Sequence, residues 1–219
     1  MKKIFLLILA SLVLFIAHAQ EDTSRVKGKG MQGLGLTFGY NHAIIHLESS
    51  AMFIPNSDRV ITAKSGNAAG ASAGITYEYR KNNFSIRPAA EAAIIFAYVE
   101  YDVQRTDKEE GWIFPFTIDI PVHFMYHPNN PKLPSILVGP RALIPISAFN
   151  GVQPPQSSFG FNVEGAISFP IKLKSNTMRL EAGYSFGLND LLKKESGNEY
   201  TEILEFVRRD LVTFKLYFN

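Results

Sequence analysis

Apolar and polar residues alternate along most of the chain. Between residues 69 and 80, one set of alternate positions reads Ala, Ala, Ala, Ile, Tyr, Tyr, and the other set reads Gly, Ser, Gly, Thr, Glu, Arg. A period of two is the pattern of a β-strand, whose successive side chains point to opposite faces. Eight such runs follow one another, at residues 32–47, 69–80, 84–101, 114–127, 134–146, 158–171, 177–187 and 208–219.

The runs are long for strands. They contain 11 to 18 residues, whereas the usual strand has about 5–6. At about 3.3 Å per residue, even the shortest run extends roughly 36 Å, which suits a tilted strand that crosses a bilayer. Residues 89–99 alternate poorly, and a short helix is the alternative there.

The connections between the runs alternate in length. Three are short, at residues 81–83, 128–133 and 172–176, and four are long, at residues 48–68, 102–113, 147–157 and 188–207. Outer-membrane barrels have short periplasmic turns and longer extracellular loops. The pattern therefore predicts an all-β fold over residues 32–219, namely an eight-stranded antiparallel transmembrane β-barrel. Because the number of strands is even, both termini of the barrel lie on the side of the short turns.

Several prolines fall inside or near the predicted strands. Proline removes a donor from the ladder, and a closed barrel has no edge strand that could accommodate it. We therefore expect bulges or strand ends at several of these positions, with true strand boundaries at Pro121 and Pro170. The prolines concerned are Pro88, Pro121, Pro140, Pro145 and Pro170.

The polar face indicates which side of each strand is enclosed. It consists mainly of small residues with isolated charges, whereas a soluble barrel or β-sandwich, the alternative, carries long solvated side chains outside. Five acids and five bases cancel on this face, as an enclosed interior requires. The predicted interior charge network comprises Glu78, Arg80, Arg87, Glu91, Asp119, Arg141, Glu164, Arg179, Glu181 and Lys215.

Eight strands enclose an interior that side chains can just fill, so we expect no wide aqueous pore. Aromatic residues near the strand ends are expected to form girdles at the two membrane interfaces. These aromatic residues are Tyr77, Tyr79, Tyr98, Tyr101, Trp112, Phe114, Tyr126, Tyr184 and Tyr217.

The first residues have the features of an export signal. Lys2 and Lys3 precede an apolar run from Ile4 to Ala17, and small residues flank His18 before Gln20. This order predicts a secretory signal peptide at residues 1–19 and a flexible leader at residues 20–31. An N-terminal membrane anchor is the alternative, although the run is short for a span of about 20 residues.

Composition excludes several classes of function. The 219 residues are 46% hydrophobic and 19% charged, which argues against disorder. Lys2 and Lys3 account for the whole net charge of +2, so the exported chain has no electrostatic basis for binding nucleic acid. The absence of cysteine excludes disulfides, thiolate nucleophiles and zinc–thiolate sites.

Little in the sequence indicates catalysis. His42 and His46, like His123 and His127, are four residues apart, which on a strand separates the side chains by roughly 13 Å. We therefore expect structural polar residues rather than metal ligands, and no cofactor. Nothing pairs a base with the serines that remain formal candidates for a nucleophile near the rim, so we expect no enzyme; these serines are Ser147, Ser157 and Ser158.

Four segments of the chain carry a resemblance to a known family. They are GLGLTFGYN (33–41), IDIPVHFMYH (118–127), ILVGPR (136–141) and EAGYSFGLNDL (181–191). With these segments the chain resembles the PorT family of outer-membrane β-barrels. The resemblance implies an outer-membrane barrel and, through the member that gives the family its name, a link to type IX protein secretion. It implies no catalytic residues.

These observations favour a non-enzymatic protein of the bacterial outer membrane with a structural or accessory role, in type IX secretion or other surface machinery. The alternatives are a narrow porin for small solutes, a lipid-modifying barrel enzyme and a soluble periplasmic barrel. The expected partners are outer-membrane lipid, the barrel-assembly machinery, and secretion-system proteins that dock on the extracellular loops or on the periplasmic leader. Deletion of most of residues 188–207 is expected to leave folding intact.

Overall fold

The structure is a computed structural model, and it describes the strands and part of their connections. The described residues are 32–49, 52–54, 59–66, 68–103, 109–113, 116–130, 133–146, 159–172, 177–192 and 204–218. The predicted signal peptide and leader lie outside them. Within these ranges, no helix is long and apolar enough to span a membrane.

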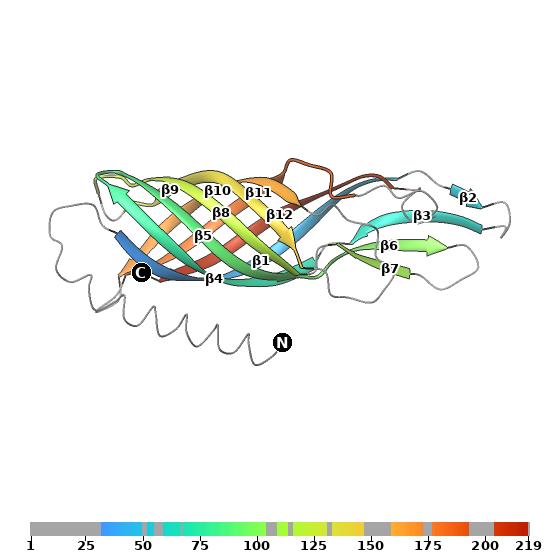
Figure 1. The fold of residues 1–219 in the computed structure, drawn as a ribbon, viewed down its shortest axis with the longest axis horizontal. Coiled ribbons are helices and arrows are strands. Elements are labelled where there is room, and N and C mark those ends of the chain that lie inside the picture. The colour runs from blue at the N-terminus through green and yellow to red at the C-terminus, as the bar shows by residue number, and fades with distance from the viewer. Residues whose placement is uncertain are drawn as a thin grey trace, which may run out of the picture.

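Eight long antiparallel strands close into a barrel (Figure 1). Each strand pairs with the next barrel strand along the chain, and β1 pairs with both β4 and β12, which closes the ladder. The predicted fold class is thereby confirmed. The barrel strands are β1 (Gln32–Ser49), β4 (Ala68–Lys81), β5 (Phe84–Ile95), β8 (Phe116–Tyr126), β9 (Ser135–Pro145), β10 (Gly160–Lys172), β11 (Thr177–Gly187) and β12 (Leu204–Phe218).

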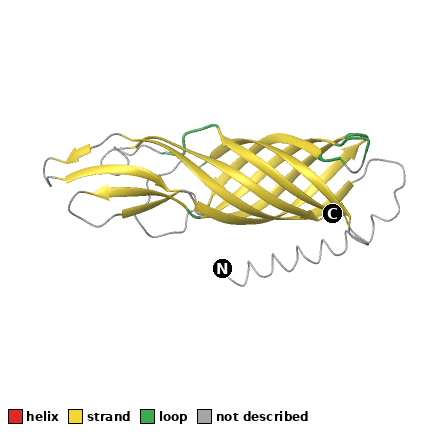
Figure 2. Cartoon of the chain, turned by 180° about the vertical axis from the view of Figure 1, so that it is seen from behind, coloured by secondary structure: helices red, strands yellow, loops and turns green. Residues whose placement is uncertain are grey.

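Four further strands form a second sheet beyond one end of the barrel (Figures 1 and 2). Its strand order is β2-β3-β6-β7, and we call this end of the barrel the sheet end. The opposite end, the turn end, has the tight β4–β5 turn, where Asn82 adopts a positive φ of 56° that asparagine tolerates. The strands of the second sheet are β2 (Met52–Ile54), β3 (Arg59–Gly66), β6 (Ala97–Val103) and β7 (Glu109–Ile113).

The second sheet corrects three expectations. Residues 48–68 and 102–113, expected as loops, contain strands of this sheet. The run expected at residues 84–101 is divided at Phe96, whose backbone N–H donates to Ala69 O at 3.3 Å before the chain leaves the barrel as β6. Both parts are strands, so the helical alternative for residues 89–99 is wrong.

The prolines do not divide the strands. Pro121 pairs with Arg141 and Pro170 with Arg179, both inside continuous strands, so neither marks a boundary. Pro145 is the last residue of β9. The register across Pro88 is unchanged, because Thr76 pairs with Ala89 on one side and Tyr79 with Ile86 on the other. Each of these prolines lacks a backbone N–H and can therefore cost the ladder one hydrogen bond, but none of them introduces a bulge.

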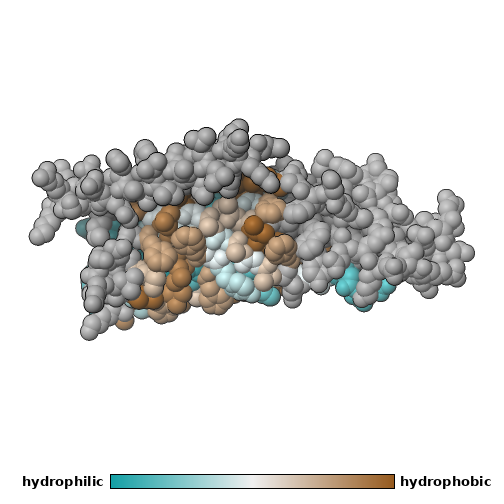
Figure 3. All heavy atoms as spheres, turned by 90° about the horizontal axis from the view of Figure 1, so that it is seen from below, coloured by the Kyte–Doolittle hydropathy of each residue, from teal (hydrophilic) through white to brown (hydrophobic). Residues whose placement is uncertain are grey.

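The alternation of the sequence corresponds to two different faces. Along β5, side chains alternate strictly between exposed and buried. On β4, Ala73 and Tyr77 are exposed on the outer wall, whereas Glu78 is buried inside. Figure 3 shows apolar residues, in tan and brown, over much of the described part of the barrel wall, beside a smaller pale patch. The barrel therefore has an apolar exterior.

Gly139 allows β8 and β9 to approach each other. A Cβ atom there would lie 1.9 Å from Val122 O and 2.9 Å from Val122 C, both backbone atoms that cannot move aside. We expect Gly139→Ala to lower the free energy of unfolding by about 1–3 kcal/mol, because the strands must separate. Urea unfolding in detergent measures this change.

Gly165→Ala is the matched control, because a Cβ at Gly165 would have no heavy atom within 4 Å. Its free energy of unfolding is expected to stay close to that of the wild type. Equal loss of stability in both variants would contradict the close approach at Gly139.

Candidate functional site

The middle of the barrel interior contains a cluster of buried ions. The fully buried guanidinium of Arg141 donates to Asp119 at 2.6 and 3.1 Å, to Glu91 at 3.0 Å and to Glu164 at 3.0 Å. The ammonium of Lys215 lies 3.0 Å from Glu91 Oε1 and 3.5 Å from Glu164 Oε1. We call these five residues the central ion cluster.

The central ion cluster is assembled by tertiary structure alone. Each of its members lies on a different strand, namely β5, β8, β9, β10 or β12, at a position whose side chain points inward. Hydroxyl groups complete the coordination: Thr117 donates to Asp119 at 2.5 Å, and Thr213 donates to Glu164 at 3.4 Å. Buried carboxylates of this kind require such partners, because the barrel wall separates them from bulk water.

A second group of ion pairs, the turn-end ion cluster, lies between the central cluster and the turn end. Arg87 donates to both carboxylate oxygens of Glu181 at 2.6 Å, and Arg179 donates to Glu78 at 3.0 Å. The Tyr217 ring lies beside both guanidiniums, at 4.7 Å from Arg87 and 5.7 Å from Arg179. Tyr217, expected in an outer girdle, is therefore an interior residue, because it shares the inward face of β12.

The interior histidines connect polar groups. His127 Nε2 lies 2.8 Å from Ser85 Oγ and 3.3 Å from Glu78 Oε1, and its Nδ1 lies 2.9 Å from Ser135 Oγ. His123 Nε2 lies 3.4 Å from Glu164. Among the described residues, no three His, Asp or Glu side chains are grouped so that they could hold a metal ion.

The structure places nine of the ten predicted network residues in these two clusters, and Arg80 outside them. Arg80 lies at the end of β4, where its Nε donates to Asn82 O at 3.0 Å in an exposed contact. Arg209 on β12, which the sequence reasoning missed, is fully buried in the interior, where Asp119 attracts and Arg141 repels its guanidinium. With Arg209 in place of Arg80, the described interior still contains five acids and five strong bases.

The sheet end of the interior is mainly apolar apart from Arg209, contrary to the expectation of ions and small residues throughout. There a cluster of buried side chains forms what we call the mouth plug. Its members are Ala43, Ile45, Ala63, Ala93, Ile95, Val99, Leu191, Leu192, Leu204, Val207 and Leu211.

The plug includes both ends of the β11–β12 connection. The Leu191 N–H donates to Val207 O at 2.8 Å, and the Asp190 carboxylate accepts the N–H groups of Leu192 and Val207 at 3.0 Å each. Residues 188–192 and 204–207 therefore take part in the packing of the sheet end, and we expect a deletion that includes them to destabilise the barrel. That most of residues 188–207 can be deleted without effect on folding stays a prediction. Residues 193–203 lie outside the described residues.

A further polar cluster lies on the outer wall near the sheet end. Asp210 occupies an outward position of β12, yet it is only 1% exposed. Its carboxylate accepts the Tyr184 hydroxyl at 2.5 Å and the Gly187 N–H at 2.9 Å, lies 2.9 Å from His46 Nε2, and lies 3.3 Å from Arg208 Nε. We call His46, Tyr184, Arg208 and Asp210 the outer-rim cluster. The sequence reasoning missed it, because only the cross-strand register brings these residues together.

Taken together, the fold and the site define a closed eight-stranded antiparallel β-barrel with an apolar wall and a charge-compensated interior. No family model matches the chain, and no curated protein matches its sequence. Its structure is similar to the crystal structure of a neisserial surface protein, NspA, with 17% sequence identity and a TM-score of 0.43. The match covers 88% of this chain and 99% of that protein.

Arg141 is the residue on which the central ion cluster depends most. In Arg141→Met, three buried carboxylates lose their shared guanidinium, and we expect a loss of about 3–5 kcal/mol in the free energy of unfolding. The loss is measured by urea unfolding in detergent, with the folded fraction read from heat-modifiable migration on gels. Arg80→Met is the control and should change stability by less than about 1 kcal/mol; a similar loss in both variants would contradict the assigned role of Arg141.

Proposed function

We propose that this protein is a non-enzymatic outer-membrane β-barrel protein with a structural or accessory role in the cell envelope. The observation that carries the proposal is the outer wall, where large apolar side chains are exposed on every barrel strand. Water disfavours such a continuous apolar surface, whereas lipid acyl chains do not. The most exposed of these side chains on the strands include Phe38, Phe84, Phe124, Ile136 and Val138.

The dimensions of the wall support the proposal. β8 has 11 residues from Phe116 to Tyr126, which is about 36 Å along the strand and roughly 25–30 Å along the axis of a barrel with the usual tilt. Outward tyrosines flank the apolar band, with Tyr79 and Tyr126 toward the turn end and Tyr40 and Tyr184 toward the sheet end. Aromatic girdles of this kind are typical of the two interfaces of a membrane barrel.

The interior supports a structural rather than a catalytic role. Its acids and bases are paired with one another, and the apolar mouth plug closes the sheet end within the described residues. The serines considered as nucleophiles, Ser147, Ser157 and Ser158, lie outside the described residues. The second sheet extends beyond the barrel mouth, where it offers a surface for a partner.

The more specific proposal is that the protein assists type IX secretion. The resemblance to the PorT family supports it, and the second sheet together with the leader would provide docking surfaces for secretion-system proteins. Insertion would require the barrel-assembly machinery. We expect deletion of the gene in its host to retain secreted cargo in the periplasm, and the cloned gene to restore secretion; normal secretion in the deletion strain would contradict the secretory role.

The narrow porin remains the alternative function, and the filled interior argues against it. A porin requires a continuous aqueous path, whereas Arg141 and its three carboxylates cross the middle of the interior. A large, steady conductance of the purified protein in planar bilayers would favour the porin over the proposed role.

The membrane location can be tested on the outer wall. Ile167 is exposed on β10 within the apolar band, and we expect Ile167→Arg to lower the free energy of unfolding in lipid bilayers by about 2–4 kcal/mol, because the charge would face hydrocarbon. Leu133→Arg is the control, since Leu133 is also exposed but lies in the β8–β9 connection. Wild-type stability of Ile167→Arg, or recovery of the protein from cells without detergent, would indicate a soluble barrel instead.

A further inference from the structure

The outer-rim cluster lies where the apolar band ends. On the paired strands β1 and β12, Tyr40 is opposite Phe214, Ile44 is opposite Asp210 and His46 is opposite Arg208. The outward side chains thus change from aromatic to ionic within a few residues of the sheet end. If the wall faces lipid, as proposed above, this step is the boundary between acyl chains and headgroups.

The outer-rim cluster presents nitrogen groups outward and keeps its carboxylate covered. Asp210 is 1% exposed, whereas the side chains of Arg208 and His46 are 24% and 44% exposed. The guanidinium of Arg208 also lies over the Phe186 ring at 4.3 Å, which holds it against the wall. Asp210 therefore fixes two nitrogen-bearing groups at the depth of the headgroups, in a geometry that exists before any ligand binds.

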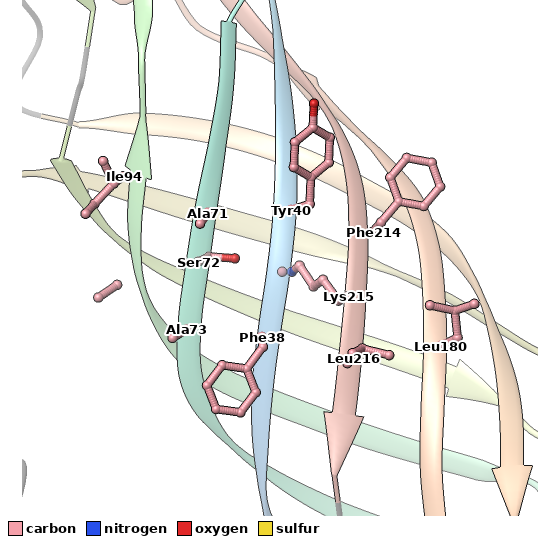
Figure 4. A pocket seen from close by; sticks show the side chains of 12 residues that line it. Phe38, Tyr40, Ala71, Ser72, Ala73, Ile94, Leu180, Phe214, Lys215 and Leu216 are labelled. Carbon is pink, nitrogen blue, oxygen red and sulfur yellow. The ribbon is translucent and has the colours of Figure 1, made fainter.

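An apolar groove lies on the same part of the wall (Figure 4). Its volume is about 710 Å³. The short side chains of Ala71 and Ala73 on β4 lie between Ile94 on β5 and the larger side chains on β1 and β12. The outward residues that line it include Phe38, Tyr40, Ala71, Ala73, Ile94 and Phe214. Because the alanine side chains are short, a space is left between Ile94 and the aromatic rings on β1 and β12.

The groove and the outer-rim cluster lie on the same outward face of β1 and β12. Phe214 lines the groove, and Asp210 lies four residues further along β12, a distance of about 13 Å. A diacyl lipid could span this distance, with its headgroup at the outer-rim cluster and an acyl chain in the groove. Glu48, exposed two residues beyond His46 on β1, would repel an anion that approached from the sheet side, so a phosphate would reach Arg208 from the bilayer side.

We propose that this wall of the barrel binds a lipid with a phosphate headgroup, whose phosphate is held by Arg208 and His46 and whose acyl chain occupies the groove. The inference rests on the proposed membrane location and adds a specific ligand class to it. A purely structural role for the outer-rim cluster, in which Asp210 only joins β1, β11 and β12, predicts no preference among lipids. Lipid selectivity therefore distinguishes the two roles.

The test is native mass spectrometry of the full-length, delipidated protein folded in detergent. The probes are phosphatidylglycerol and a galactosyl diacylglycerol with the same acyl chains, which lacks phosphate. We expect phosphatidylglycerol to bind on the order of tenfold more tightly, as charge-assisted hydrogen bonds to a phosphate would give. Equal binding of the two lipids would overturn the proposal.

Variants locate the site. Arg208→Gln should reduce phosphatidylglycerol binding to the level of the galactolipid, and Ala71→Phe, which fills the groove, should weaken both lipids. The matched controls are Arg80→Gln at the turn end and Ala142→Phe on β9, on the opposite side of the barrel, and both should bind lipid as the wild type does. Unchanged selectivity in Arg208→Gln, or equal losses in the controls, would overturn the proposed site.

Folding is monitored in each variant by heat-modifiable migration. If Arg208→Gln does not fold, His46→Gln takes its place, because the His46 side chain is 44% exposed, more than that of Arg208. His46→Gln should lose part of the preference for phosphatidylglycerol. Failure of the wild type to insert into bilayers would refute the membrane location. Normal insertion with no lipid preference would refute only the lipid site.

Discussion

The structure depends on the compensation of charge inside a closed sheet. Closure removes every strand edge, so an inward side chain of the barrel has only other inward side chains as neighbours. A carboxylate there must meet a cation, because an unpaired buried ion is far more costly than a paired one. Arg141 meets this requirement for three carboxylates at once, and Lys215 shares two of the three.

The same compensation specifies the register of the strands. A slip of one residue would turn every inward side chain to the outer wall, and the central ion cluster takes its members from five strands. A slip on any of them would place a charge on the apolar wall and leave its partner unpaired inside. The ion clusters therefore favour one arrangement of the barrel over its neighbours in register, whatever their net contribution to stability.

The barrel could be predicted from the sequence because its two faces meet different surroundings. Alternation from residues 69 to 80 indicates one strand with two chemically distinct sides, and the structure has β4 there. The second sheet could not be predicted in the same way. Its strands are short, as in β2 with three residues and β7 with five, so a period of two has too few repeats to distinguish them from loops.

The interior charges were predictable from alternation, because the inward and outward faces of each strand meet different surroundings. Three charged residues depart from the prediction. Arg80 has the correct parity but lies at the end of β4, where exposure rather than the barrel decides its contacts. Arg209 shares the parity of Lys215 and Tyr217 and lies within the predicted run of residues 208–219, so alternation alone would have placed its side chain inside the barrel. Asp210 has outward parity, so alternation assigns it to the apolar wall. Its burial follows from the side-chain contacts that it makes with His46 on β1 and Tyr184 on β11.

The two ends of the barrel differ in a way that bears on its role. The turn end closes with paired ions and a short turn, whereas the sheet end closes with an apolar plug that includes Leu191 and Leu204 from the two ends of the β11–β12 connection. Apolar packing of this kind gains stability by removing apolar surface from water. The base of the second sheet is joined to the same core through Ala63 and Val99. The sheet is therefore held at a defined position relative to the barrel wall, and a rigid position is what an exposed docking surface requires if a partner is to meet it in one orientation.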